Sequence, residues 1–195
     1  MFKRKISDVE IQLLQGDISK QENIEAIVNA ANAQLKTGGG VAGAIHRAAG
    51  SGLEKECSPL ASIKPGEAVI TGGHSLPNKF VIHCLGPVYG VDKPEDELLR
   101  DCYINSLNLA EENKVESIAF PAISTGAFGY PIDKATKIAL KTVLERLSDF
   151  EYIKRIRFVL YSKDDLDIYE NNLTEMINWY SKIVDEGDYK VEKIY

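Results

Sequence analysis

Two glycine-rich stretches of the chain have residue types suited to holding an anion. "TGGG" (37–40) follows the apolar run 26–31 and precedes an alanine-rich segment, and "STGAFG" (124–129) follows the apolar run 117–123. Glycine lets the backbone approach a ligand closely, and the N–H groups at a helix start favour negative charge. Two such loops at neighbouring strand ends could grip a diphosphate without any lysine. For either run alone, a flexible connector is the alternative.

Neither run matches a common nucleotide-binding fingerprint. No glycine run continues as Gly-Lys-Ser/Thr, as a P-loop requires, and Gly-x-Gly-x-x-Gly is absent in the strand–helix setting of a dinucleotide fold. Kinase and dehydrogenase functions are therefore not favoured.

Polar and aromatic residues near other strand ends could complete a nucleotide site. Asp17 could accept a hydrogen bond from an exocyclic amine such as that of adenine, and its alternative role is a helix N-cap. Asn32 lies nearer the glycine loop and could contact a sugar hydroxyl, whereas we expect Asn29 to brace the loop. Phe128 and Tyr161 could cover a sugar or stack on a base, with a place in the core as the alternative.

The cysteines and histidines do not predict a metal site. Adjacent strand residues point to opposite faces, so His83 and Cys84 are not expected to share an ion. Neither a disulfide framework nor paired zinc spacing is visible. We expect packed or solvated side chains at all six positions, which are Cys57, Cys84, Cys102, His46, His74 and His83.

Strands and helices alternate along the chain. β-branched or alternating apolar residues predict six strands, at 9–14, 26–31, 67–71, 79–86, 117–123 and 155–161. Helical periodicity is present in 41–49, 95–113, 133–148 and 166–184. This pattern predicts an α/β domain with a largely parallel sheet covered on both faces. In such sheets ligands bind beyond the carboxyl ends of the strands, where the segments described above lie.

Length and charge limit the function further. The 195 residues fit a single domain, 1–195, with a core at about 9–184 and a polar tail at 185–195. No signal peptide or membrane-length apolar run is visible, so we expect a cytoplasmic protein without membrane contact. The net charge of −6 and the lack of a basic stripe argue against nucleic acid as a partner. Backbone N–H groups would therefore have to hold an anionic ligand.

Six ordered blocks of this sequence resemble the macrodomain family, and most of all its MacroD-like and O-acetyl-ADP-ribose deacetylase branch. They are "GDIS", "IVNAAN", "GGGVAGAIHRAAG", "GEAVITGG", "VIHCLGPVYG" and "FPAISTGAFGYP". The similarity covers roughly residues 9 to 162. It implies a three-layer α/β/α fold around a six-stranded mixed sheet, and a cleft that binds ADP-ribose without a metal or cofactor.

The resemblance also implies roles for single residues. Asp17 would bind the adenine amino group, with the backbone of Ile18 beside it and Tyr161 stacked on the ring. Asn32 would lie at the distal ribose and is the candidate for positioning the attacking water. Two facing loops would surround the diphosphate and distal ribose, with Gly39, Gly40 and Val41 on one side and Ser124, Thr125, Gly126, Ala127 and Phe128 on the other.

Position 42 departs from the hydrolytic pattern. Hydrolytic members of the MacroD-like branch carry "GGGVDGAIH", and this chain has Ala42 in place of the aspartate. A carboxylate there could orient water towards the anomeric carbon, and general-base assistance contributes about 10²–10⁴-fold. Other members, including some viral and archaeal macrodomains, have alanine at this position, and some of those still hydrolyse mono-ADP-ribosyl esters.

Three functions therefore remain open. The first is a hydrolase that removes ADP-ribose from acidic side chains of mono-ADP-ribosylated proteins, or that deacetylates O-acetyl-ADP-ribose. In that enzyme, the substrate's own phosphate would activate the water. The second is a module that reads ADP-ribose without turnover. The third is an interaction domain with an empty cleft.

Overall fold

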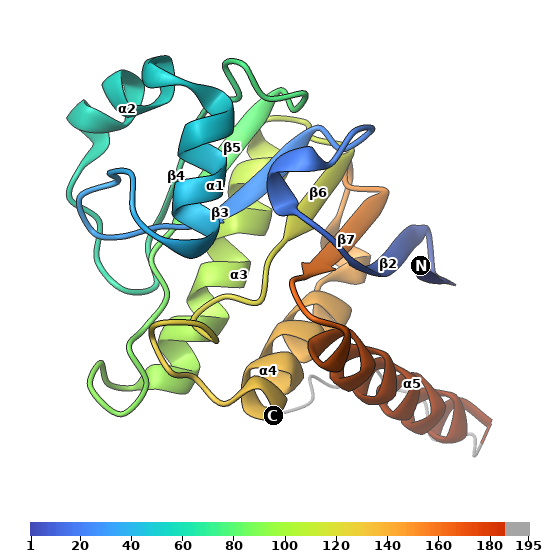
Figure 1. The fold of residues 1–195 in the computed structure, drawn as a ribbon. Coiled ribbons are helices and arrows are strands. Elements are labelled where there is room, and N and C mark those ends of the chain that lie inside the picture. Colours follow the sequence, from blue (N-terminus) through green and yellow to red (C-terminus); the bar gives the residue numbers. More distant parts are fainter. Residues whose placement is uncertain (186–195) are drawn as a thin grey trace.

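A mixed sheet of seven strands forms the centre of the molecule (Figure 1). The computed structural model describes residues 1–185, so the predicted polar tail lies outside the described residues from position 186 onwards. In spatial order the strands are β1 (Phe2–Ile6), β2 (Val9–Gln15), β7 (Arg155–Leu160), β6 (Ser117–Phe120), β3 (Ala26–Ala30), β5 (Phe80–Cys84) and β4 (Ala68–Gly72). The five central strands are parallel, and β1 and β4 are antiparallel edge strands.

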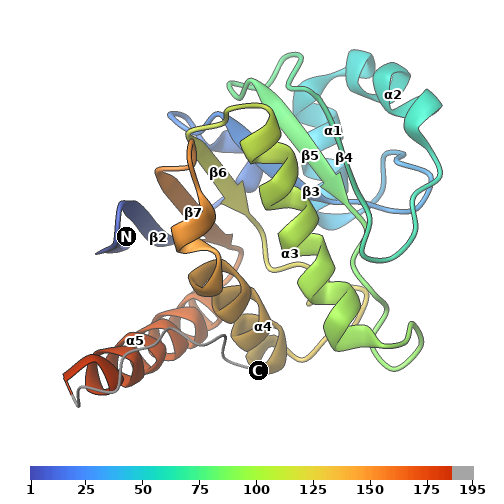
Figure 2. The same cartoon turned by 180° about the vertical axis from the view of Figure 1, so that it is seen from behind.

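Helices cover both faces of this sheet. On one face α1 (Gly40–Ala49) packs on β3, and α2 (Ser51–Cys57) packs on β4. The other face carries α3 (Glu95–Glu112), α4 (Ile132–Glu145) and α5 (Lys163–Asp185), which share one apolar core (Figure 2). Short 3₁₀ turns occur at η1 (Ile18–Lys20), η2 (Ser58–Leu60) and η3 (Leu147–Asp149). The predicted three-layer α/β/α class is confirmed.

The strand count differs from the expected six because β1 was not predicted. Its sequence, "FKRKI", has three consecutive charged residues in the middle, which breaks the alternation that marks a half-buried strand. Only the terminal Phe2 and Ile6 pack against the core, while β2 supplies the pairing partners. Tertiary pairing in an antiparallel hairpin therefore decides this edge strand. The seven-residue helix α2 was also not predicted.

Parallel order brings the carboxyl ends of the central strands to one edge of the sheet. The segments that follow β2, β3, β6 and β7 all begin at this edge, and Figure 1 shows β3, β6 and β7 running towards it. These are the segments that contain the predicted site residues. None of the helices described within residues 1–185 is both long enough and apolar enough to cross a membrane.

Candidate functional site: a cleft at the strand ends

The glycine loop after β3 packs tightly against the start of α1. Gly40 has a φ of +52°, which favours glycine, and a side chain on Gly43 would place its Cβ 2.3 Å from the Gly38 carbonyl oxygen. Around Gly39 and Gly40 the space is open, with no heavy atom within 4 Å of a built Cβ. The glycines therefore serve two purposes, because Gly43 allows close packing and Gly39 and Gly40 leave room above the helix start.

Unpaired backbone N–H groups gather in this loop. In α1 the first bond of the helix runs from the Gly43 N–H to the Gly39 carbonyl at 3.1 Å. Within the described residues, the N–H groups of Gly39, Gly40, Val41 and Ala42 have no protein acceptor. No carboxylate side chain caps this helix, since its N-cap residue is Gly39. The result is an uncapped helix start that favours an anion.

The loop after β6 also contains backbone N–H groups without a protein partner in the described residues. Ser124 has a φ of +66°, and its carbonyl accepts a bond from the Tyr130 N–H at 3.0 Å, which closes the loop on itself. Within the part of the chain that the structure describes, the N–H groups of Gly126, Ala127 and Phe128 have no protein partner. A non-glycine residue held at positive φ stores backbone strain, and such strain clusters at functional sites.

Gly86, just after β5, packs closely against Ser124, the residue held at positive φ. A side chain on Gly86 would place its Cβ 2.1 Å from the Ser124 Oγ. That hydroxyl is buried without a partner in the described structure. The loop is further tied down where the Tyr89 N–H bonds the Phe128 carbonyl at 2.9 Å. The position of the second loop is therefore set by β5 and its following loop as well as by its own sequence.

Asp17 is both an N-cap and an open acceptor. Its Oδ1 accepts bonds from the Ser19 N–H at 2.9 Å and the Ser19 hydroxyl at 2.7 Å, so the capping alternative is confirmed. The Oδ2 has only Lys20 nearby, at 3.7 Å. Hydrogen bonds from the Ser19 hydroxyl and amide lower the pKa of Asp17 below its ordinary value, although partial burial opposes them. A charged acceptor thus stands beside the N–H of Ile18, which has no protein partner in residues 1–185.

The two asparagines hold different parts of the structure. Asn32 donates to the Lys36 carbonyl at 2.7 Å and accepts from the Lys36 N–H at 3.1 Å, so it braces the loop. Asn29 is fully buried and donates to His83 Nδ1 at 3.0 Å. The expectation that Asn29 braces the loop was wrong, because its side chain points across the sheet to β5 rather than towards the loop.

Ala42 and Asn32 both lie close to Gly38. A Cβ built on Gly38 would be 3.3 Å from Asn32 Nδ2 and 3.9 Å from Ala42 Cβ, so the three positions converge. Ala42 is buried in the first turn of α1, where the helix dipole favours negative charge. A carboxylate at position 42 would therefore be favoured by the dipole at the start of α1.

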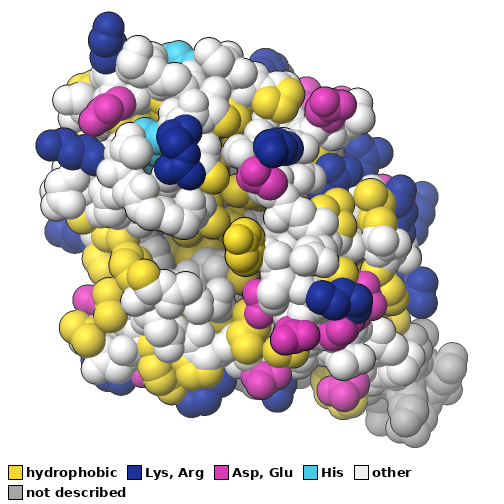
Figure 3. All heavy atoms as spheres, viewed as in Figure 1, with side chains coloured by type: hydrophobic (Ala, Val, Ile, Leu, Met, Phe, Trp, Pro, Cys, Tyr) yellow, Lys and Arg dark blue, Asp and Glu magenta, His cyan; other side chains and the backbone are white. Residues whose placement is uncertain are grey.

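The two aromatic candidates differ in exposure. Phe128 is half-buried and packs, like Val41, against the apolar cluster on the α1 side of the sheet. Tyr161 is 90% exposed just after β7, so the core alternative does not apply to it. Figure 3 shows hydrophobic side chains in a hollow near the centre of the face on which β3, β6 and β7 end.

The family model described as "Macro domain" matches residues 28–139 of the chain. The chain belongs to the macro domain family. It is 46% identical over 170 residues to the O-acetyl-ADP-ribose deacetylase of Escherichia coli, which covers 85% of this chain and 96% of that protein.

Solved structures of macro domains are similar in fold. One is the Oceanobacillus iheyensis macrodomain with ADP, which is 41% identical with a TM-score of 0.87 and covers 91% of this chain and 97% of that one. Another is the Trypanosoma brucei macrodomain in complex with ADP-ribose, at 38% identity and a TM-score of 0.77, covering 83% of this chain and 68% of that one.

Outside the cleft, this macro domain contains a buried cluster that sequence spacing did not reveal. The ligand atoms of His46, Cys57 and His83 lie within 4.8 Å of one another. Burial raises the pKa of the Cys57 thiol to about 11 and lowers that of His83 to about 3. His83 Nε2 also has Thr71 Oγ1 at 2.9 Å and Cys57 Sγ at 3.6 Å. His83 therefore bonds side chains of α2 and β4, whereas His46 of α1 packs edge-on against its ring and the His46 Nε2 has no hydrogen-bond partner in the described residues, so we interpret the cluster as a packed link between α1, α2, β4 and β5.

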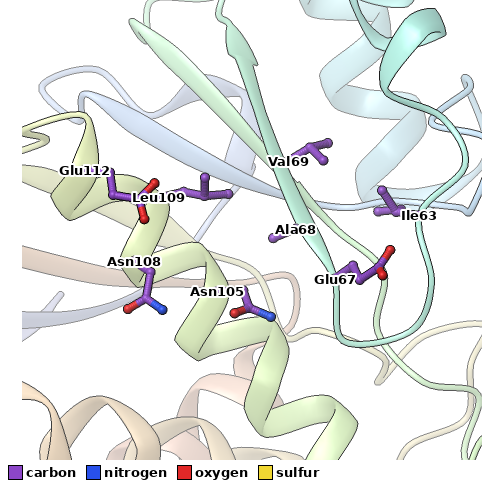
Figure 4. Close-up of a pocket in the computed structure, with 8 residues that line it drawn as sticks. All are labelled: Ile63, Glu67, Ala68, Val69, Asn105, Asn108, Leu109 and Glu112. Carbon is purple, nitrogen blue, oxygen red and sulfur yellow. The ribbon is translucent and has the colours of Figure 1, made fainter.

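A cavity of about 390 Å³ lies elsewhere in this macro domain, between α3 and β4 (Figure 4). None of the predicted ligand-binding residues lines it. Its wall contains Glu67 and Glu112 and no lysine or arginine, so it would repel an anion. The charge of its lining therefore argues against this cavity as a nucleotide site, in contrast to the strand-end cleft.

Proposed function

We propose that this macro domain binds ADP-ribose in the strand-end cleft and hydrolyses ester bonds to it. The observation that carries the proposal is the set of unpaired N–H groups in the two loops after β3 and β6. Backbone donors at a helix start and in a glycine loop hold a diphosphate without basic side chains, which suits a chain with a net charge of −6. The names of the E. coli and T. brucei relatives support the same ligand.

The end of β2 supplies a complement to adenine. The Watson–Crick edge of adenine has an amino donor next to a ring-nitrogen acceptor. Asp17 Oδ2 is an open acceptor, and the neighbouring Ile18 N–H is an open donor. Tyr161, exposed after β7, is available to stack on the ring. We therefore assign adenine to this end of the cleft and the distal ribose to Asn32 and the loop 124–128.

For catalysis we propose positional assistance. Ala42 has no carboxylate, so the water that attacks must be activated by the diphosphate of the substrate itself. Asn32 and the loop N–H groups would hold the ribose and phosphates in the geometry of attack, and correct positioning alone can lower a barrier substantially. The substrates are esters of ADP-ribose on acidic side chains of modified proteins, or O-acetyl-ADP-ribose.

A reader of ADP-ribose without turnover is the second candidate. Two observations favour it, namely the apolar side chain at position 42 and the commitment of the Asn32 amide to Lys36. Neither group can act as a general base as it stands. Such a module would recognise mono-ADP-ribosylated proteins through the same cleft.

A hydrolysis assay separates these functions. An acidic protein carrying ester-linked ADP-ribose is incubated with the chain, and released ADP-ribose is measured beside O-acetyl-ADP-ribose deacetylation. Release above the uncatalysed rate supports the hydrolase, and binding by calorimetry without release supports the reader. If calorimetry detects no binding of ADP-ribose at millimolar concentration, both functions fail and an interaction domain is left.

Compartment and domain organisation complete the proposal. We propose that residues 1–195 act as one domain in the cytoplasm. The three cysteines are buried and unpaired, which suits a compartment that keeps thiols reduced. Fractionation of cells followed by detection of the protein tests this assignment.

A further inference from the structure

A buried arginine near the Asp17 turn forms no ion pair within the described residues, and Glu10, which favours its charge, is paired with Arg155 instead. Arg157 of β7 is 9% exposed, and its guanidinium is held by two neutral side chains. The Nε donates to Gln12 Oε1 at 2.8 Å, and a terminal nitrogen donates to Gln21 Oε1 at 3.1 Å. No ion pair within residues 1–185 includes Arg157, whereas Arg155 on the same strand pairs with Glu10 at 3.1 Å.

Burying this cation has a cost. Burial, followed by the nearby Arg155, lowers the pKa of Arg157 from its ordinary value, and Glu10 opposes this lowering only in part. Replacing such a buried ion by apolar side chains is often neutral or stabilising, so stability alone does not account for it. Arg157, Gln12 and the small Ala119 are aligned across β7, β2 and β6.

Gln21 connects the Arg157 guanidinium to the turn that contains Asp17. With its Oε1 bound to Arg157, the amide is oriented so that Nε2 donates to the Asp17 carbonyl oxygen at 2.7 Å. The backbone carbonyl of Gln21 is held in turn by the buried Asn78 at 2.8 Å. Gln21 is itself buried, and both the Oε1 and the Nε2 of its side chain form hydrogen bonds within the protein. The turn that presents the Asp17 carboxylate and the Ile18 N–H therefore rests on this bridge.

We infer that Arg157 and Gln21 are positioning residues that make the cleft selective for adenine over other bases. The inference rests on the proposed binding of ADP-ribose. Hypoxanthine reverses the edge that the turn reads, because it has a carbonyl where adenine has an amine and a ring N–H where adenine has an acceptor. A rigid turn cannot move to pair with hypoxanthine, so the affinity for that base is low. A loose turn can adjust, so the affinity difference between the two bases becomes smaller.

The test compares the affinities for ADP-ribose and inosine diphosphate ribose by calorimetry. Gln21→Glu keeps the acceptor for Arg157 and removes the N–H donor to the Asp17 carbonyl. The parent should prefer ADP-ribose by tenfold or more, and this variant should lose most of that preference, about tenfold for one hydrogen-bonded positioning contact. Because Gln12 Nε2 donates to Glu10, the control is the double variant Glu10→Gln with Gln12→Glu, which puts a carboxylate against the same guanidinium from β2 without pairing two carboxylates and without contacting Asp17, and it should keep the preference.

A second variant keeps the test decisive if Gln21→Glu does not fold. Arg157→Met removes the cation at similar length and leaves the Gln21 amide without its orienting partner, so the preference should fall in the same direction. A merely structural role would lower the unfolding temperature and weaken both ligands equally, leaving the affinity ratio unchanged. An unchanged ratio in Gln21→Glu and Arg157→Met overturns the inference, as does equal binding of both nucleotides by the parent. If the parent binds neither nucleotide, the proposed function itself fails.

Discussion

The two ends of the cleft are built in different ways. At the proposed adenine end, side chains hold Asp17 in place. Ser19 binds its carboxylate, and the Gln21 side chain binds its backbone carbonyl. At the ribose end the donors are backbone N–H groups in open glycine loops, and the one amide nearby, that of Asn32, is bound to its own loop. The first end is anchored through side chains to the sheet, and the second depends on backbone shape.

Because of this difference, we expect ligand binding and turnover to depend on residues at different ends of the cleft. An anchored recognition end binds the nucleotide whether or not the ribose end contains a catalytic group. We propose that general-base chemistry at the ribose end requires a carboxylate at position 42, where this chain has Ala42. Changes at the two ends should therefore affect different measurements, and the following experiments test this separation.

The largest expected effect is on the rate of ester hydrolysis in Ala42→Asp. A carboxylate in the first turn of α1 could accept a proton from water, which contributes about 10²–10⁴-fold. The measurement is ADP-ribose release under single turnover. Ala42→Asn is the matched control, with nearly the same shape and no base, and its rate should remain at the parent value. Equal rates in the two variants would mean that the missing carboxylate does not limit turnover.

The next effect is on affinity, in Asp17→Ala. Loss of the carboxylate should weaken ADP-ribose binding by about 1–3 kcal/mol, because a polar partner is left unpaired. Calorimetry measures this loss. Lys20→Ala is the control, since Lys20 is exposed and lies 3.7 Å from the carboxylate, and it should change affinity little. An affinity in Asp17→Ala equal to that of the parent would remove Asp17 from the site.

A smaller effect is expected when the backbone of the ribose end is disturbed. In Gly43→Ala the new Cβ would clash with the Gly38 carbonyl, and overpacking of this kind costs about 1–3 kcal/mol of stability. Displacement of the loop should lower ADP-ribose affinity by about fivefold, the low end of that range. Gly52→Ala is the control, because its Cβ would meet only the His74 ring outside the cleft. If both variants bind ADP-ribose as the parent does, the loop shape is not required.

The smallest effect is that of pH on binding. Hydrogen bonds from Ser19 lower the pKa of Asp17, so the charged acceptor is present above that lowered value and is lost only as the pH falls through it. Affinity should therefore stay constant from pH 7 to 5 and fall only below the ordinary aspartate value of about 3.9. In Ser19→Ala the fall should move to higher pH. A loss of affinity already at pH 5 in the parent would contradict the role of Ser19.

Most of the fold was predictable from local sequence, whereas the assignment of the site residues stays a prediction. Period-2 and period-3.6 patterns located six strands and four helices, because burial on a sheet face or a helix stripe leaves a periodic signal. The edge strand β1 was missed because it owes its structure to pairing with β2. The Arg157–Gln21–Asp17 chain was also missed, because its members are brought together by the register of β2 and β7 and have no common sequence spacing.

The sequence by itself predicted the type of site, a nucleotide-diphosphate cleft of glycine loops in an acidic α/β protein. Glycine and helix starts dictate this chemistry locally, since backbone conformation depends mainly on neighbouring residues. Only the tertiary structure decided which asparagine braces the loop, that Asp17 is both cap and acceptor, and that His46, Cys57 and His83 meet. Those outcomes depend on which residues the sheet register places in contact, and contacts between distant segments leave no local pattern in one sequence.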